Sequence, residues 1–138
     1  MELRKTFRTG ISRDEAVERL CDDATLVSLL PGDTEIVSSD GDRRTTRTRY
    51  TALGREGVAT FHFTYQLDGS MRFEKVCDGK VWRKLEGSVE VDEDPPGARV
   101  TIGMDGRTKT LVPEMAIKGP LEDQMQTMVD ALKALLDA

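Results

Sequence analysis

His62 is the only histidine of the chain, and it lies in an alternating run of residues between Thr60 and Thr64. Histidine exchanges protons near neutral pH more readily than any other side chain. Here it shares its strand face with threonines, opposite a row of aromatic residues, so we interpret it as an outward-facing residue without a catalytic role. Cys21 and Cys77 are far apart in sequence, which favours two reduced, packed cysteines and predicts neither a metal cluster nor a catalytic triad.

Tyr50 and Tyr65 are better candidates for a polar group inside a binding cavity, because each combines an apolar ring with a hydroxyl at its tip. Tyr65 alternates with Phe61 and Phe63, so we expect its ring to be buried. Its hydroxyl either contacts a ligand or is satisfied by backbone or water. The face occupied by Trp82 cannot be assigned from the sequence.

The basic cluster of the chain is no nucleic-acid signature. Arg43, Arg44, Arg47 and Arg49 are followed by a single aromatic residue, and the net charge of the chain is -5. Basic surfaces with interleaved aromatic residues are typical of nucleic-acid binding. We interpret the arginines as a solvated face paired with acids of neighbouring strands, and the net charge also argues against a general affinity for anionic membranes.

The length of 138 residues fits one domain, and we expect residues 1–138 to form it. No apolar run approaches the ~18–20 residues of a membrane span. The first residues, Met1 to Lys5, lack the apolar stretch of a signal peptide, so we expect a cytoplasmic protein without integral membrane association.

The N-terminal third predicts one strand and two short helices. Residues 2–9 alternate, with Leu3 and Phe7 on one face. Ser12 and Glu15 form the S-x-x-E capping box that begins the first helix, which is expected to bury Ala16, Val17, Leu20 and Cys21. The second helix begins near Asp23, buries Leu26, Leu29 and Leu30, and ends at Pro31-Gly32.

From Asp33 to Val112 the sequence predicts six antiparallel strands. Short runs rich in Thr, Val, Phe and Tyr alternate with turn signals. These signals are Asp40-Gly41, Gly54 to Gly57, Asp68-Gly69, Asp78-Gly79, Pro95-Pro96-Gly97 and Asp105-Gly106. The last of them predicts either a bulge within the final strand or a turn that splits it.

The run from Val58 to Leu67 has the clearest alternation. Its buried face is predicted to hold Ala59, Phe61, Phe63, Tyr65 and Leu67. Placing Phe73 on this face requires a three-residue loop, Asp68 to Ser70, which pairs Tyr65 with Phe73 and Leu67 with Met71, or else a bulge. A two-residue loop would expose Phe73.

The segment from Gly119 to Ala138 predicts one amphipathic helix with Pro120 at its first position. Its apolar residues recur at spacings of three and four. They are Leu121, Met125, Met128, Val129, Leu132, Leu135 and Leu136. Such a helix needs a sheet to cover.

This order of elements resembles the helix-grip architecture of the START/Bet v1-like (SRPBCC) superfamily, near its polyketide cyclase/dehydrase and carbon monoxide dehydrogenase-related bacterial groups. The Leu29-Leu30-Pro31-Gly32 exit and the Gly119-Pro120 start add to the resemblance. It implies an α+β fold in which a seven-stranded antiparallel sheet wraps around the long C-terminal helix. It also implies a cavity between them for a lipid, sterol, polyketide or hormone.

The resulting prediction is a binding site for a small hydrophobic or amphipathic ligand. Its expected lining is Phe61, Phe63, Tyr65, Phe73, Ile102, Met104, Met125 and Met128. Methionines, Met71 and Met115 included, suit either an adaptable cavity wall or a filled core. Two alternatives stay open: a cyclase or dehydratase using the same cavity, and a protein-interaction module with a collapsed one. No catalytic residue, metal or cofactor is predicted, and a monomer and a homodimer are both open.

Overall fold

A computed structural model describes residues 1–30, 32–52, 54–77 and 81–137 of the protein. The elements run in chain order as β1 (Glu2–Thr9), α1 (Arg13–Leu20), α2 (Asp23–Leu29), β2 (Asp33–Asp40), β3 (Arg43–Ala52), β4 (Arg55–Tyr65), β5 (Met71–Lys75), β6 (Trp82–Asp94), β7 (Gly97–Thr108) and α3 (Glu114–Leu136). One strand precedes the two short helices and six follow them, which confirms the predicted order.

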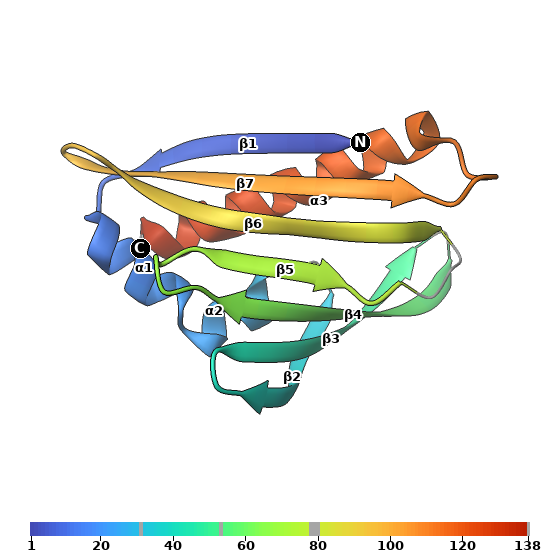
Figure 1. Ribbon diagram of the computed structural model, residues 1–138, viewed down its shortest axis with the longest axis horizontal. Coiled ribbons are helices and arrows are strands. Elements are labelled where there is room, and N and C mark those ends of the chain that lie inside the picture. The colour runs from blue at the N-terminus through green and yellow to red at the C-terminus, as the bar shows by residue number, and fades with distance from the viewer. Residues whose placement is uncertain (31, 53, 78–80, 138) are drawn as a thin grey trace.

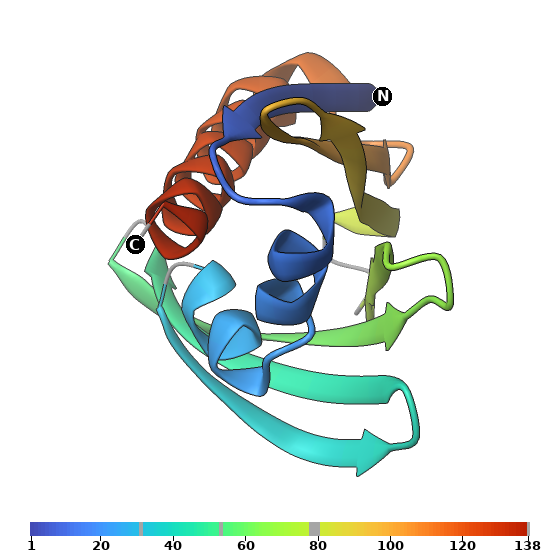
Figure 2. The same ribbon diagram turned by 90° about the vertical axis from the view of Figure 1, so that its left-hand side faces the viewer.

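The strands form one antiparallel sheet in the order β1-β7-β6-β5-β4-β3-β2. The first strand therefore pairs with the last, and α1 and α2 carry the chain from one edge of the sheet to the other (Figure 1). Figure 2 shows the sheet curving around α1 and α2, with α3 along its open side. The concave face of the sheet is thus the face that the helices cover.

The start of α1 confirms half of the predicted capping box. The Ser12 hydroxyl accepts a hydrogen bond from the Glu15 amide at 3.2 Å. The Glu15 carboxylate pairs with Arg19 at 3.0 Å instead of returning to Ser12. Ala16 and Leu20 are buried as expected. The burial predicted for Cys21 is wrong, because Cys21 is the C-cap, where the chain turns away from the helix and the side chain is exposed.

The long helix α3 begins at Glu114, five residues before the predicted start at Gly119. Pro113 is its N-cap, and Pro120 lies inside the helix. An internal proline removes one backbone hydrogen bond, but the apolar residues that follow bury one face of α3 and hold the helix together. Met115, predicted to lie in the core, is 90% exposed because it belongs to this additional first turn.

The hairpin between β4 and β5 places Phe73 on the buried face, as predicted, but in a different register. Tyr65 pairs with Met71 and Phe63 with Phe73, two residues from the predicted pairing. The reason is the turn: the Asp68 carboxylate accepts hydrogen bonds from the amide and hydroxyl of Ser70, at 2.9 and 2.6 Å. Leu67, expected on the buried face, is fully exposed in this loop.

The final strand is continuous through Asp105 and Gly106, so neither the bulge nor the splitting turn that were the two alternatives lies there. The irregularity of this strand pair lies in the partner, between Trp82 and Lys84 of β6. The turn signal Asp78-Gly79 falls outside the described residues. Gly41 and Gly69 adopt positive φ angles of 58° and 86° at the first two of the four Asp-Gly signals, as those turns require.

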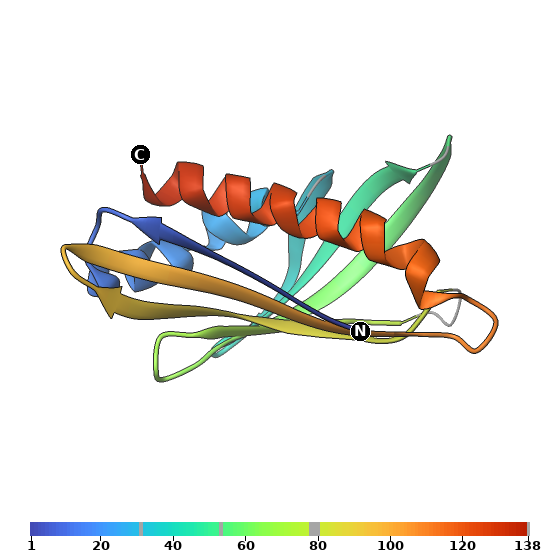
Figure 3. The ribbon, with the colours of Figure 1, turned by 90° about the horizontal axis from the view of Figure 1, so that it is seen from above.

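The C-terminal half of α3 closes the core against β1, β7, α1 and α2 (Figure 3). The predicted apolar positions are buried except Leu135, which is half-buried. The Arg19 guanidinium donates to the last carbonyls of the helix, those of Leu135 and Leu136, at 3.0 and 3.1 Å. The Thr9 hydroxyl donates to Asp137 at 2.8 Å. The two Arg19 bonds satisfy carbonyls that a helix end leaves unpaired, and the Thr9 bond ties the C-cap residue to β1.

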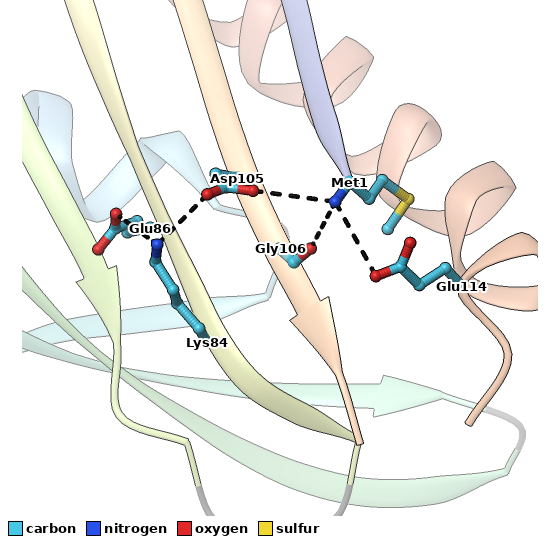
Figure 4. A network of polar contacts seen from close by, with 6 residues as sticks. All are labelled: Met1, Lys84, Glu86, Asp105, Gly106 and Glu114. Atoms are coloured by element: carbon cyan, nitrogen blue, oxygen red, sulfur yellow. Dashed lines mark hydrogen bonds and ion pairs between the residues drawn. The ribbon is translucent and has the colours of Figure 1, made fainter. Parts of the chain in front are cut away.

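A polar network joins the start of α3 to β1 and β7 (Figure 4). The Met1 ammonium donates to the Gly106 carbonyl at 3.0 Å and lies 3.9 Å from the carboxylates of Asp105 and Glu114. Lys84 bridges Glu86 and Asp105 at 3.2 and 3.3 Å, and these two carboxylates raise the pKa of Lys84. The network holds the strands in register at the edge of the sheet.

Candidate ligand-binding site

A cavity of about 760 Å³ lies between the N-terminal half of α3 and the concave face of β3 to β6. Ligand pockets in proteins have volumes of roughly 300–1,000 Å³, and a water molecule takes roughly 30 Å³ of liquid volume. The space is therefore far larger than a few waters need, and it has the size of a site for a small organic molecule.

The sheet wall of the cavity is apolar and includes one small side chain. Phe61 and Ala59 of β4 face inward beside Leu85 of β6, and all three are buried. Thr48 of β3 lies opposite Ala59, and its hydroxyl is already hydrogen-bonded to the Thr34 hydroxyl at 2.7 Å. The short side chain of Ala59 leaves room where its neighbours along β4 carry phenyl rings.

Two aromatic rings lie over glycines at the side of the cavity. A Cβ atom added at Gly57 would lie 2.5 Å from Cζ of Tyr50, and one added at Gly106 would lie 2.5 Å from Cζ3 of Trp82. Each ring therefore occupies the space that a side chain on the neighbouring strand would take. Gly106 pairs with Leu85 on the concave face, which places Trp82 on that face too.

The helix wall is more polar than the sheet wall. Ile117, Pro120 and Leu121 are its apolar residues, and Gln124 and Thr127 follow on the next turns. Of this wall, Leu121 is buried and the others are partly or fully exposed. The helix therefore offers both an apolar surface and hydrogen-bonding groups to an occupant.

Among the described residues, two charged side chains line the cavity, Lys75 of β5 and Asp123 of α3. Lys75 alternates with Met71 and Phe73, so it follows them on the concave face, and it pairs with Phe61 across the strands. It is half-buried and makes no ion pair within the described part of the chain. Asp123 is exposed. Lys75 is thus the cation of a wall that otherwise holds apolar and hydroxyl-bearing side chains.

Comparisons of sequence identify no relative: no protein-family model matches, and no curated protein matches. Comparisons of structure are informative. A START superfamily protein from Mycobacterium smegmatis has a TM-score of 0.77 at 17% identity, covering 98% of this chain and 96% of its own. The Zhui aromatase/cyclase from Streptomyces sp. R1128 has a TM-score of 0.76 at 15% identity, over 99% and 91%.

A STAR-related lipid transfer protein fragment from Xanthomonas axonopodis also matches, with a TM-score of 0.71 at 21% identity over 98% of this chain and 85% of the fragment. The chain has the START/Bet v1-like helix-grip fold. This confirms the resemblance inferred from the element order. At these identities the likeness is one of fold, and it leaves the ligand to be argued from the cavity.

Of the eight residues predicted to line a helix-grip cavity, the structure places Phe61 in the cavity wall. Phe63 and Phe73 lie behind it, with ring centroids 6.1 and 6.5 Å from that of Phe61. The remaining buried residues belong to the packed core and not to the cavity surface. They are Ile102, Met104, Met125 and Met128, exposed by 0, 4, 0 and 1%.

Tyr65 is tied to α2 instead of facing the cavity. Its hydroxyl donates to the Asp23 carboxylate at 3.4 Å, and the Arg44 guanidinium lies 5.5 Å from its ring centroid. Arg44 also pairs with Asp23 at 3.0 Å. Burial, followed by the negative charge of Asp23, raises the pKa of Tyr65 well above its ordinary value, against the opposing effect of Arg44. This tyrosine anchors a helix to the sheet.

His62 faces outward, as predicted, and lines a polar hollow of about 650 Å³ on the outer face of the sheet. Its Nδ1 is 2.8 Å from the Thr45 hydroxyl. Among the described residues no group of three or more His, Cys, Asp or Glu side chains could hold a metal ion. No described helix is long and apolar enough to cross a membrane.

One cavity residue whose face the sequence analysis did not assign, Trp82, is marked by a glycine on the neighbouring strand, because its ring lies over Gly106. Glycine within an alternating strand is a usable signal, because it often marks a place where another group approaches closely. Lys75 could have been recognised from its spacing after Met71 and Phe73.

Proposed function

We propose that the protein binds a small amphipathic molecule in the cavity between α3 and the sheet. The observation that carries this proposal is the volume of about 760 Å³ beside Phe61, Leu85 and Leu121. An apolar ligand surface buried there would contribute roughly 25 cal/mol per Å². The fold neighbours that are named for lipid transfer or for polyketide cyclisation support a ligand of this general class.

Lys75 is proposed to bind the polar end of the ligand. An ammonium at an apolar wall is stabilised by a charge-assisted hydrogen bond to an anionic group. Because Lys75 has no ion-pair partner within the described residues, a carboxylate or phosphate of the ligand would supply one. The ligand class proposed is therefore a carboxylate- or phosphate-bearing amphiphile.

Of the predicted ligand residues, we propose that Phe61 contacts the ligand directly. The other seven shape the site from behind by filling the core: Phe63, Tyr65, Phe73, Ile102, Met104, Met125 and Met128. Residues 1–138 are proposed to act as one domain. A cytoplasmic location is also proposed, since Cys21 and Cys77 are free thiols.

Native mass spectrometry of the purified protein, followed by extraction of bound molecules, tests the proposal. We expect a bound amphiphile that is lost in Ala59→Phe, because the added ring fills the cavity. Val58→Phe is the matched control: Val58 is the neighbouring residue on the outer face of β4 and is 55% exposed. If no ligand is found and a panel of fatty acids and lysophospholipids fails to bind, the proposal is wrong.

A second variant tests the polar end. Lys75→Met keeps the length of the side chain and removes the charge, so we expect at least about tenfold weaker binding of an anionic amphiphile. Binding of the corresponding neutral alcohol should be unchanged. Equal losses for the acid and the alcohol would contradict the role of Lys75 while leaving the cavity proposal intact.

The structure favours neither alternative to ligand binding. An enzyme would need an acid or base shielded from water in the cavity. Asp123 and Tyr50 line the cavity but are exposed, and His62 lies on the opposite face of the sheet. Lys75 is half-buried in the cavity, and its proposed role is to bind the polar end of the ligand. An interaction module with a collapsed core would lack the cavity. We therefore propose binding without a reaction.

A further inference from the structure

Two large apolar side chains protrude from one end of the molecule. Leu111 is 94% exposed in the turn between β7 and α3, and Met115 is 90% exposed in the first turn of α3. Among the described residues, the other apolar side chain with comparable exposure is Leu67, at 104% in the β4–β5 loop. Figure 1 shows that this loop and the β7–α3 turn lie at opposite ends of the sheet.

Hydrogen bonds hold Leu111 in its outward position. The Val112 amide donates to the Lys109 carbonyl at 2.9 Å, which closes the turn, and the Thr108 hydroxyl donates to the Val112 carbonyl at 2.7 Å. The Lys109 amide donates to the Val81 carbonyl at 2.9 Å and ties the turn to the start of β6. The exposure of Leu111 thus belongs to an ordered turn.

The segment that carries these two side chains has more cations than acids, although the whole chain carries -5. Residues 107–118 contain Arg107, Lys109 and Lys118, and Glu114 is the acidic residue among them. The Glu114 carboxylate lies 3.9 Å from the Met1 ammonium, which lies at the same distance from Asp105. Arg107, Lys109 and Lys118 are all exposed. Exposed apolar side chains with exposed cations close to them in the sequence suit the interface of an anionic bilayer.

This end of the molecule is continuous with the mouth of the cavity. Val81, which accepts the hydrogen bond from Lys109, also lines the cavity. Ile117 lines it too, two residues after Met115 on α3. A surface that met the bilayer through Leu111 and Met115 would bring the cavity next to the lipid.

We propose that Leu111 and Met115, with Lys109 and Lys118, form a docking tip that binds the surface of anionic membranes. Two isolated protruding side chains fit this occupant better than a protein partner, because a stable protein interface buries roughly 800 Å² of each partner. A membrane needs only shallow insertion of apolar groups and nearby cations. The docking tip goes beyond ligand binding in the cavity and does not depend on it.

Co-sedimentation with vesicles tests the docking tip. The protein should bind vesicles of phosphatidylcholine and phosphatidylserine, and binding should fall as salt is raised. Leu111→Ser with Met115→Ser should weaken binding at least about tenfold. Leu67→Ser, at the opposite end, is the matched control and should bind like the parent protein. Circular dichroism checks that each variant is folded.

The charges are tested separately. Lys109→Glu with Lys118→Glu should abolish the preference for phosphatidylserine over pure phosphatidylcholine. Absence of vesicle binding at low salt, or equal losses in the tip and Leu67 variants, would overturn the proposal and leave a protein partner as the occupant to be sought. A protein that failed to bind vesicles but retained a copurified amphiphile would keep its proposed function without this docking mode.

Discussion

The two ends of α3 meet the sheet in different ways. Towards its C-terminus the helix buries Met125, Met128 and Leu132 almost completely, and Arg19 and Thr9 bind its final residues. Towards its N-terminus the helix has no side-chain cap, contains Pro120 and borders the cavity. The same amphipathic helix thus serves as a core element at one end and as a cavity wall at the other.

Side-chain size on the sheet produces this difference. At the closed end, Phe63 and Phe73 face each other across β4 and β5 with ring centroids 5.9 Å apart. At the open end the corresponding position of β4 holds Ala59, which pairs with Thr48 of β3. Phenyl rings fill the space under the helix at one end, and the short Ala59 side chain leaves space at the other. Four sets of changes to the protein test this comparison.

The largest effect is expected from truncation at the closed end. Leu132→Ala removes a side chain that is 0% exposed and should lower the free energy of unfolding by about 2–5 kcal/mol. Leu121→Ala, in the cavity wall, should cost about 1–2 kcal/mol, because atoms are already missing on one side of Leu121. Urea denaturation measures both values, and equal losses would show that the two ends are packed alike.

Replacing a small side chain by a larger one should also affect the two ends differently. Ala98→Leu overpacks a core position that is 0% exposed and should cost about 1–3 kcal/mol. Ala59→Leu places the same atoms in the cavity and should change the free energy of unfolding by less than about 1 kcal/mol. Thermal and urea unfolding of the pair provide the measurement. A large loss in Ala59→Leu would mean that the cavity is not available to additional atoms.

A smaller effect is expected where β3 passes from the closed end to the cavity. Thr46 is 0% exposed, and its hydroxyl has no hydrogen-bond partner among the described residues. Thr46→Val removes this cost and should stabilise the fold by about 1 kcal/mol. Thr48→Val breaks the hydrogen bond to Thr34 and should destabilise by a similar amount. Stabilisation by both, or by neither, would contradict the assignment of their hydroxyls.

The smallest effect at neutral pH is expected for Tyr65, the anchor at the closed end. The pKa of Tyr65 is raised, so the folded state favours the neutral phenol. The contribution of Tyr65 to the free energy of unfolding is therefore fully present below about pH 10, the ordinary pKa of tyrosine. As the pH rises further, ionisation is easier in the unfolded chain and stability falls. Tyr65→Phe should reduce this loss of stability at alkaline pH. It should also remove the tyrosinate absorbance that develops at the highest pH in a titration. An unchanged titration would contradict the burial of this hydroxyl.

Local patterns predicted the elements well because each depends on neighbouring residues. The Ser12 cap, the Asp-Gly turns and the alternation from Ala59 to Phe63 need no tertiary contact to be recognised. The predictions that were wrong depended on contacts that periodicity does not record. The register of β5 followed from side-chain hydrogen bonds within the Asp68–Ser70 turn. Proline usually marks the first turn of a helix, but α3 begins at Glu114 and Pro120 lies inside it.

The sequence by itself determined the order of the elements and the apolar face of each, because periodicity records which side chains must leave water. The helix-grip fold then followed from the resemblance of this order of elements to a known architecture. Only the tertiary structure decided where that fold is filled and where it is hollow. That choice depends on which residues of neighbouring strands come to lie opposite one another: Phe63 pairs with Phe73, whereas Ala59 pairs with Thr48. Side chains from several strands together fill or leave open the space under the helix, so no single segment of the sequence specifies the cavity.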